Sequence, residues 1–177
     1  MSGRSVVKYG DPSLKRRASE IQEIDDSVRK LASEMFAALE ASRGVGLAAP
    51  QLGVSLRLIV LSIPREDETR WKCAIVNPEF VSKRGTVTSE EGCLSVPGVY
   101  EDISRAEEVR VRGLDLEGKE IVVEGKGLLA RAIQHEMDHL DGLLIIDRLS
   151  SAKRHALQKK LRELEESGRR SGGKRTS

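Results

Sequence analysis

Two of the three histidines lie four residues apart, in the segment His135-Glu136-Met137-Asp138-His139. Residues at positions i and i+4 share one face of a helix, with Cβ atoms about 5–6 Å apart, so both imidazoles can reach one metal ion. Glu136 projects from an adjacent angle and can act on a water at that ion without being a ligand. The same pattern on a solvated helix face is the alternative, but the surrounding residues are apolar and predict a buried helix, where histidines need partners.

A catalytic metal ion usually has three protein ligands and one open position, so the two histidines need a third. In metzincin-type proteases a histidine follows the second ligand by six residues, and here that position is Ile145, which argues against this class. The other candidates are Cys93 and four downstream residues, Asp147, His155, Glu163 and Glu165. We favour Cys93, because Gly92 before it allows a close approach of the backbone to a ligand. Cys73 begins an apolar stretch and is expected to be an ordinary core residue.

A third segment, Gly44-Val45-Gly46-Leu47-Ala48-Ala49-Pro50-Gln51, combines glycines and small residues with one amide. It lacks the Lys-Ser/Thr pair of a phosphate-binding loop and does not match the dinucleotide-binding glycine pattern. A tight connection between a helix and a strand explains the glycines equally well. Gln51 is the exception, because an amide at the end of a packed loop can donate a hydrogen bond to a ligand.

Three helices are expected to position these residues. The first covers about residues 25–43, where apolar residues recur every three or four positions, with Asp25 or Asp26 as N-cap and Gly44 at the C-terminal cap. The second covers about 127–140, carries both histidines and stops at Gly142. The third covers about 150–166, with Leu157, Leu161 and Leu164 on one face.

Short β-like stretches fill the middle of the chain, at 56–62, 74–77 and 79–88, and a hairpin is predicted from 109–115 and 120–124. Strands in the middle and helices at the ends indicate an α+β fold: small antiparallel sheets packed around a central metal-binding helix, with N-terminal and C-terminal helices. We expect one catalytic domain over residues 1–166. Residues 167–177, rich in Gly, Ser, Arg and Lys, are expected to be a disordered basic tail.

Composition narrows the class of protein. The 177 residues are 38% hydrophobic and 33% charged, which fits one globular domain. Apolar runs stay far below the ~18 residues of a spanning helix, and no secretory h-region is found at the start. Two cysteines do not make a disulfide framework, so we expect a reducing cytoplasm and no membrane partner.

The net charge of +2 hides an uneven distribution. Residues 153–177 contain nine basic and three acidic side chains, whereas residues 1–152 contain 21 basic and 25 acidic ones. A mildly acidic body therefore precedes a basic C-terminal segment. This segment is either a solvated helix face with a loose tail or a docking element for RNA, and RNA binding through phosphates would depend strongly on salt.

Taken together, the three segments resemble peptide deformylase. Residues 44–51 are similar to that family's first motif, Gly-x-Gly-x-Ala-Ala-Pro-Gln, residues 91–95 (Glu-Gly-Cys-Leu-Ser) to its second, and residues 134–139 (Gln-His-Glu-Met-Asp-His) to its third. The motifs occur in the family's order, and the resemblance runs from about Val6 to near Glu166. The helical C-terminal end resembles the bacterial class whose chain finishes in a helix.

The resemblance implies an enzyme that removes the formyl group from the N-terminal formyl-methionine of new polypeptides and releases formate. It assigns the divalent metal ion to Cys93, His135 and His139, with water in the fourth position. It also implies that Glu136 is the general base. The side chain of Gln51 and the backbone N–H of Leu94 would then stabilise the charge on the formyl oxygen.

The methionine side chain needs an apolar pocket, and we expect its walls to be Val45, Leu94, Ile133 and the ring of His135. The backbone at Val45 and Gly46 is expected to pair with the substrate as an added strand. Fe(II) is the physiological ion that the resemblance implies, while Zn(II), Ni(II) and Co(II) suit the same ligands. The expected partners are formyl-Met nascent chains and, through the basic C-terminal segment, the ribosome of a bacterial cytoplasm, with no DNA partner.

Two other classes of function fit part of these patterns. One is a protease or other amidase that uses the same Cys-His-His site. The other is an RNA- or ribosome-binding domain with a structural metal ion, although five aromatic residues are few for base stacking. Replacing Glu136 with Gln separates catalysis from a structural role, because only an enzyme would lose activity while retaining metal.

Overall fold

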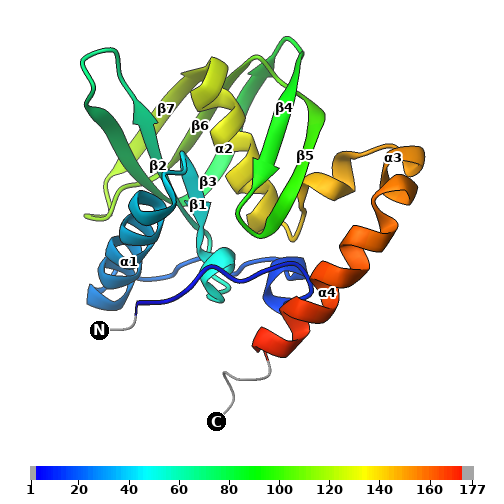
Figure 1. Ribbon diagram of the computed structural model, residues 1–177. Coiled ribbons are helices and arrows are strands. Elements are labelled where there is room, and N and C mark those ends of the chain that lie inside the picture. The colour runs from blue at the N-terminus through cyan, green and yellow to red at the C-terminus, as the bar shows by residue number, and fades with distance from the viewer. Residues whose placement is uncertain (1–2, 173–177) are drawn as a thin grey trace.

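A computed structural model of the protein describes residues 3–172 (Figure 1). Its helices are α1 (Asp26–Ser42), α2 (Gly127–Leu140), α3 (Ser151–Ala156) and α4 (Gln158–Gly172), with 3-10 turns η1 (Pro12–Lys15), η2 (Ala49–Leu52) and η3 (Ile145–Arg148). Its strands are β1 (Gly46–Ala48), β2 (Leu58–Pro64), β3 (Arg70–Arg84), β4 (Val87–Cys93), β5 (Val96–Arg105), β6 (Glu108–Leu114) and β7 (Glu120–Lys126). No helix within 3–172 is long and apolar enough to cross a membrane.

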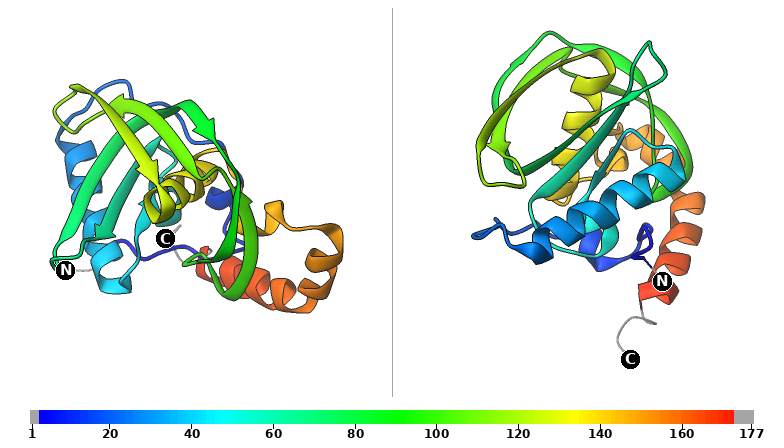
Figure 2. Two further views of the ribbon diagram at one scale, coloured as in Figure 1. Left: turned by 90° about the horizontal axis from the view of Figure 1, so that it is seen from above. Right: turned by 90° about the vertical axis from the view of Figure 1, so that its left-hand side faces the viewer.

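The strands form two antiparallel sheets, one of five strands in the order β1-β2-β3-β6-β7 and one of two strands, β4-β5. Helix α2 lies between the larger sheet and the β4–β5 hairpin, and α1 covers the opposite face of the larger sheet (Figures 1 and 2). The predicted α+β fold, with antiparallel sheets around a central helix and helices near both ends, is confirmed.

Strand β2 shows how the larger sheet packs against a helix on each of its faces. Leu58 and Val60 pack with the core cluster of α1, whereas Ile59 and Leu61 pack with that of α2. All four are fully buried, because side chains alternate between the two faces of a strand and both faces are covered. A continuous apolar run is therefore needed here instead of an alternating one.

Helix α1 begins where the sequence predicted, since the carboxylate of Asp25 accepts a hydrogen bond from the backbone N–H of Val28 at 3.1 Å. The predicted cap at Gly44 is one residue late. Arg43 takes the left-handed conformation, with φ of 56°, and its N–H donates to the carbonyl of Glu40 at 3.2 Å. An arginine thus occupies a position that usually favours glycine.

The middle strands depart from the prediction at β3, β4 and β5. The strand expected over 79–88 runs past the end of β3 into β4, whose remaining residues were not predicted as a strand. Strand β3 runs without interruption from Arg70 to Arg84, although two strands were expected, because Asn77 (φ 51°) and Pro78 form an irregularity where the register shifts and pairing resumes. Strand β5 was not predicted, since Pro97 and Gly98 break the alternation near its start. The hairpin β6–β7 and the bounds of α2 are confirmed.

The predicted C-terminal helix is divided at Leu157 into α3 and α4. Its apolar face packs on the N-terminal segment, where Leu161 is buried with Val7 and Tyr9. The helix continues to Gly172, so the expected disordered tail from residue 167 is wrong for residues 167–172. The physical reason is a tertiary contact: Gly168 lies so close to the carbonyl of Tyr9 that a Cβ would not fit. Residues 173–177 lie outside the described part of the chain, and the domain boundary at 166 stays a prediction.

Candidate metal centre and substrate cavity

Helix α2 places three kinds of side chain on its different faces. Its core face, which includes Ile133 and Met137, packs on the large sheet. A second face lines a cavity with residues spaced three and four apart, namely Leu128, Arg131, Ala132, His135 and Glu136. His139 continues this face inward and is only 1% exposed. The helical spacing therefore brings His135 to the wall of the cavity and His139 into the buried space directly beside it.

Cys93, from the end of β4, completes a group of three metal-ligating side chains. The ligand atoms of Cys93, His135 and His139 all lie within 4.8 Å of one another, and no other such group occurs in residues 3–172. The Nε2 atoms of the two histidines are 3.2 Å apart, and the Sγ of Cys93 is 3.5 Å from Nε2 of His139. Two imidazoles and a thiolate converging in this way fit a divalent ion such as Zn(II) or Fe(II).

The predicted choice of Cys93 over the other candidate ligands therefore agrees with the geometry. Of the alternatives, Asp147 caps η3 through the N–H of Leu144, Glu165 pairs with Arg169, and His155 and Glu163 are exposed. Both cysteines are free thiols. Burial raises the pKa of Cys73 to about 11, so this second thiol stays protonated and unreactive.

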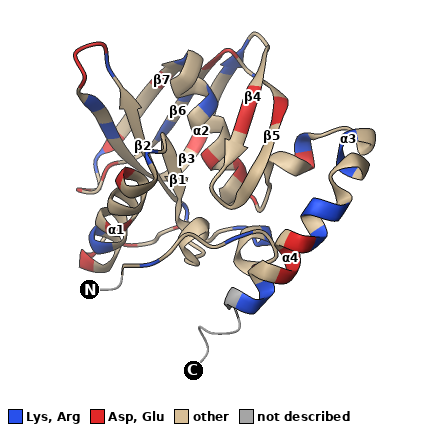
Figure 3. Ribbon diagram, in the orientation of Figure 1, with Lys and Arg blue, Asp and Glu red and all other residues tan. Residues whose placement is uncertain are grey.

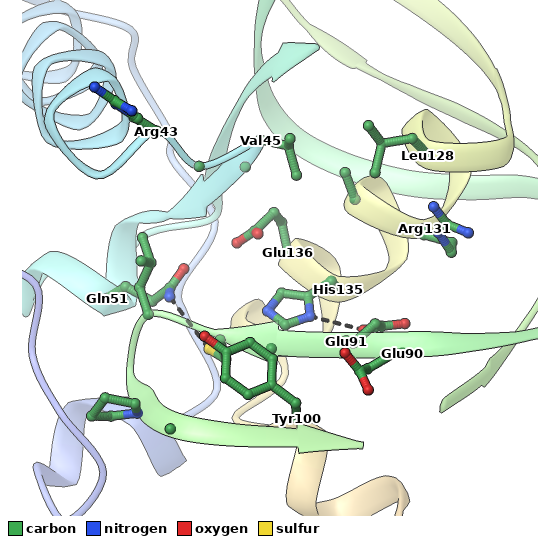
Figure 4. Close-up of a pocket in the computed structure, with 18 of the residues that line it drawn as sticks. Arg43, Val45, Gln51, Glu90, Glu91, Tyr100, Leu128, Arg131, His135 and Glu136 are labelled. Carbon is green, nitrogen blue, oxygen red and sulfur yellow. Dashed lines mark hydrogen bonds and ion pairs between the residues drawn. The ribbon is translucent and has the colours of Figure 1, made fainter. Parts of the chain in front are cut away.

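Glu91 orients the first histidine, a role that was not predicted from the sequence. Its Oε1 lies 3.1 Å from Nδ1 of His135, so Nδ1 carries the proton and Nε2 is left to face the metal position (Figure 4). The sequence does contain a signal for this contact. Glu91 lies two residues before Cys93 on a strand, and residues at this spacing share a face.

The two histidines have opposite electrostatic environments. Burial lowers the pKa of His135, but contacts with Cys93 and Glu91 outweigh burial and hold it well above its ordinary value. Burial and the neighbouring His135 together hold the pKa of His139 well below its ordinary value. The two imidazoles therefore share one proton beyond those of their neutral forms. A divalent cation competes with this extra proton for the same ring nitrogen atoms.

Glu136 is 3% exposed and lies against β1. A Cβ on Gly46 would come within 2.8 Å of its carboxylate, so only glycine allows this approach. One carboxylate oxygen, Oε2, is buried and has no hydrogen-bond partner within residues 3–172, and burial raises the pKa of Glu136 to about 7. A carboxylate with this pKa is suited to take and return a proton near neutral pH.

Gln51 lies in the turn η2 and is held by both ends of its amide. Its Oε1 accepts a hydrogen bond from the N–H of Ala48 at 3.0 Å, which turns Nε2 toward Ser95 Oγ, at 3.2 Å, and Cys93 Sγ, at 3.8 Å. The carbonyl of Leu94 accepts a hydrogen bond from Lys8 Nζ at 2.8 Å, which fixes the adjoining peptide units. The amide donor therefore points toward Cys93 at the inner end of the cavity.

A chain of charged groups supports the centre from behind. Arg105 donates to both carboxylate oxygens of Glu91, at 2.7 and 2.9 Å, and to Asp138 at 2.9 Å. Asp138 also accepts two hydrogen bonds from Arg148, each 2.6 Å long. These groups are largely buried and mutually neutralised, so they hold Glu91, and through it His135, in one position.

The cavity has a volume of about 580 Å³. Val45 and Gly46 line it as predicted, Leu94 lines it too, and Arg131, Leu128 and Tyr100 surround its mouth (Figure 4). Ile133 does not line the cavity, and its prediction as a pocket wall is wrong. It follows Ala132 by one residue, a rotation of about 100° around the helix, and is fully buried against the large sheet.

Comparison with known proteins gives a consistent match. Residues 4–155 match the family model described as polypeptide deformylase. The chain is 42% identical over 171 residues to a peptide deformylase of Alkalilimnicola ehrlichii, which covers 97% of this chain and 96% of the relative. It is 46% identical over 157 residues to one of Thermodesulfovibrio yellowstonii, covering 89% and 95%.

Solved structures of peptide deformylases share the fold of this chain. A peptide deformylase from Legionella pneumophila superposes with a TM-score of 0.85 at 44% identity, covering 93% of this chain and 96% of that one. The peptide deformylase of Ehrlichia chaffeensis in complex with actinonin superposes with a TM-score of 0.85 at 38% identity, covering 92% and 98%.

Proposed function

The chain belongs to the peptide deformylase family, and from this premise we propose how its own residues remove the formyl group from N-terminal formyl-methionine. The enzyme is a metal-dependent hydrolase: water adds to the formyl carbon, the C–N bond breaks, and formate and a free amino group leave. The observation that supports this assignment most strongly is the convergence of Cys93, His135 and His139 beside Glu136, at the inner end of a cavity.

Cys93, His135 and His139 are proposed to hold the ion. When bound, a divalent ion supplies Lewis-acid polarisation and lowers the pKa of the attacking water. Glu91 holds His135 by its Nδ1 atom, and Arg105 holds Glu91, so the nitrogen that faces the ion does not depend on the ion for its orientation. The donor set also suits several ions. We propose Fe(II) as the physiological one, with Zn(II), Ni(II) and Co(II) as substitutes.

Glu136 is proposed to be the general base. Its carboxylate lies on the cavity face of α2, one residue after the first histidine, with Oε2 free of any partner among the described residues. It takes a proton from the water as the water attacks and delivers that proton to the departing amine. The raised pKa favours both directions of this transfer near neutral pH.

Gln51 and Leu94 are proposed to stabilise the negative charge that develops on the formyl oxygen. The amide Nε2 of Gln51 is already oriented by Ala48, so it needs no rearrangement as the charge forms. The backbone N–H of Leu94 follows directly after Cys93, and Lys8 holds the carbonyl of Leu94, in the next peptide unit, in place.

The substrate is proposed to bind as an extended strand beside β1. In the described part of the chain β1 is an edge strand that pairs with β2 alone, so its other edge can accept a peptide backbone. Val45 and Gly46 line the cavity there, and Val45 together with the ring of His135 offers an apolar surface for the methionine side chain. A site that reads backbone and one apolar side chain tolerates many nascent chains.

The basic C-terminal segment is proposed to contact the ribosome of a bacterial cytoplasm. Several of its cations are engaged within the chain: Lys153 with Glu101, Arg154 with Asp147, and Arg169 with Glu165. Three others, Lys159, Arg162 and Arg170, are exposed and form no ion pair among the described residues. Figure 3 shows basic and acidic positions side by side along α4.

Ribosome contact needs a test that leaves the core intact, because deletion of the segment would remove the buried Leu161 and expose its partners Val7 and Tyr9. Reversing the three free charges together, Lys159→Glu, Arg162→Glu and Arg170→Glu, should weaken co-sedimentation with ribosomes while formate release from a short peptide is kept. The control carries Lys30→Glu, Arg110→Glu and Arg112→Glu, an equal change of net charge elsewhere. Equal sedimentation of both variants would refute the contact.

The proposed activity is tested with formyl-Met-Ala-Ser and acetyl-Met-Ala-Ser peptides, using protein freshly loaded with Fe(II), Ni(II) or Co(II) under anaerobic conditions. Formate and a new amino group should appear in equal amounts from the formyl peptide, with little release of acetate. No formate from any loaded form would refute the proposal. Cleavage of internal peptide bonds would favour the protease or amidase alternative.

A further inference from the structure

An N-terminal segment, residues 7–9, connects the two loops that carry the proposed donors to the formyl oxygen. The N–H of Val7 donates to the carbonyl of Gln51 at 2.7 Å, and the N–H of Tyr9 donates to the carbonyl of Ser95 at 2.7 Å. Gln51 supplies the side-chain donor. Ser95 forms a two-residue turn between β4 and β5 together with Leu94, which supplies the backbone donor. This segment therefore joins both halves of the site that would bind the oxyanion.

Lys8 lies between these two contacts and reaches the turn with its side chain. Its Nζ donates to the carbonyl of Leu94 at 2.8 Å, and the side chain lines the cavity. Lys8 is half-buried and forms no ion pair with any residue of 3–172, so this carbonyl is the one partner of its ammonium group there. A hydrogen bond from an ammonium group is shorter and stronger than one between neutral groups. The backbone of the turn is thus held by a charged side chain at the cavity wall.

The contact with Lys8 fixes the donor because the N–H of Leu94 cannot move far when the carbonyl of the same residue is held. Only the φ and ψ angles of Leu94 separate the two groups, since both adjoining peptide bonds are planar. Strand pairing gives less support at this place, because the register between β4 and β5 shifts between Gly92 and Cys93. Lys8 therefore supplies a constraint on the turn that the hairpin ladder does not.

Helix α4 packs against the N-terminal segment and keeps it in place (Figure 1). A Cβ on Gly168 would collide with the carbonyl of Tyr9, and one on Gly10 would collide with the backbone of Glu165. The two glycines thus allow the backbones of the helix and the segment to approach closely. The lysine side chain therefore extends from a segment that is packed on α4 and tied to two loops, and its reach to the turn is defined.

We propose that Lys8 is a positioning residue for hydrolysis of the formyl group: its ammonium holds the turn so that the Leu94 N–H points at the formyl oxygen before negative charge develops there. The inference rests on the proposed deformylase activity and deepens it. A donor fixed in advance needs no rearrangement in the transition state, which is the source of its effect on rate. The peptide itself is proposed to bind through β1 and the apolar surface at Val45. Loss of the Lys8 contact should therefore lower kcat and leave KM nearly unchanged.

Lys8→Met tests this role, because methionine keeps an unbranched stem and has no donor group. With formyl-Met-Ala-Ser and protein loaded with Ni(II) or Co(II), kcat should fall by about tenfold or more, toward the ~10²-fold that a misplacement of about 1 Å can cost. KM and the metal content of the same sample should equal those of the wild type. Lys8→Arg keeps a charged donor and should restore most of kcat. If the methionine variant does not fold, Lys8→Gln, whose donor stops one bond short, carries the same expectation.

Lys160→Met is the matched control. Lys160 also donates from Nζ to a backbone carbonyl of the same hairpin, that of Gly98. The substitution removes the same group and the same charge, but from a carbonyl that does not adjoin the donor N–H. Its kcat and KM should equal those of the wild type. Thermal unfolding of both variants is measured alongside, because a purely structural contact would lower the melting temperature and spare kcat well below it.

Four results would overturn the positioning role of Lys8. They are an unchanged kcat in Lys8→Met, a rise in KM or a loss of metal in its place, an equal loss of kcat in the Lys8 and Lys160 variants, and an arginine variant no better than the methionine variant. Formate release by the wild type would in each case leave the deformylase activity standing. Absence of formate from every loaded form of the wild type would overturn the proposed function itself, and the role of Lys8 with it.

Discussion

The cavity has two ends that differ in almost every physical respect. At the inner end, Glu136 and His139 are 3% and 1% exposed, and the groups that hold their neighbours are buried as well. At the outer end, Tyr100 and Leu128 are 64% and 37% exposed, and Arg43 carries a charge without an ion-pair partner within residues 3–172. The inner end is built to hold reacting groups in one arrangement, whereas the outer end can adapt to different peptides.

The difference also explains what supports each end. Behind the inner end lies the chain of charges from Glu91 through Arg105 and Asp138 to Arg148, whose hydrogen bonds measure 2.6–2.9 Å. The outer end has no comparable network among the described residues. Changes at the inner end should therefore alter kcat or metal retention, and changes at the outer end should alter KM or the choice of peptide.

The largest expected effect comes from Glu136→Gln. The amide keeps the size of the side chain but cannot accept the proton, so kcat for formate release should fall by about 10²–10⁴-fold. Metal content, measured by atomic spectroscopy on the same sample, should remain unchanged. Loss of the ion together with activity would mean that Glu136 acts on the metal centre as a support and not as the base.

Gln51→Ala should have the second largest effect. Removal of one oriented donor to a developing negative charge typically costs about 10²–10³-fold in kcat, with little change in KM. The control is Gln158→Ala, which truncates an exposed glutamine at the start of α4. A fall in kcat of less than threefold for Gln51→Ala, comparable to ordinary scatter, would remove this residue from the mechanism.

Arg105→Met tests the support of the inner end. Glu91 and Asp138 would lose their shared partner inside the protein, so metal affinity should fall by about 10–100-fold and the free energy of unfolding by about 3–5 kcal/mol. Competition with a chelator and chemical denaturation measure the two effects. Arg112→Met, which removes an exposed pair with Glu79, should cost less than about 1 kcal/mol. Equal effects of both variants would contradict the contrast between the ends.

The pH dependence of stability gives a smaller signal from the same network. Burial disfavours the Glu91 carboxylate, but hydrogen bonds with His135 and Arg105 outweigh burial and lower its pKa from 4.5 to about 2. Because the folded-state pKa is depressed, Glu91 stabilises the metal-free protein above its unfolded-state pKa and loses this contribution as pH falls from 4.5 toward 2. The difference in unfolding free energy between wild type and Glu91→Gln should shrink over this window. A difference that does not depend on pH would contradict this role.

The smallest effect is expected from Leu128→Ala at the mouth of the cavity. Its side chain is partly exposed, so its loss should raise KM by less than about tenfold and leave kcat and metal content unchanged. A loss of kcat as large as that of the Gln51 variant would show that the outer end takes part in the reaction and would erase the distinction.

Much of the inner end was predictable because its residues are close in sequence. The spacing of His135, Glu136 and His139 on one helix fixes their shared placement, and the bounds of α2 were predicted as observed. Cys93 was predicted from its neighbourhood. Ile133 was misplaced, because adjacent residues of a helix point in different directions and an apolar side chain serves a core as well as a pocket.

The supporting network and the outer end were not predictable in the same way. Arg105 comes from β5, a strand that the irregular alternation at Pro97 and Gly98 conceals, and its contacts depend on how the β4–β5 hairpin packs against α2. A smaller cavity beside Arg43 and Gly44 is lined by residues of α1, β2 and β3, an arrangement that exists only after folding. Local patterns thus indicate the reacting groups, whereas the groups that orient them come from tertiary contacts.

The proposed chemistry depends most on the binding of a single ion by Cys93, His135 and His139. X-ray absorption of the zinc-loaded protein tests it directly, with Cys73→Ser as background so that Cys93 is the one remaining thiol. We predict one sulfur at about 2.3 Å and two imidazole nitrogens at about 2.0–2.1 Å, and loss of the sulfur when Cys93 is replaced by Ala as well. A coordination shell of nitrogen and oxygen alone, with Cys93 in place, would contradict the proposed centre.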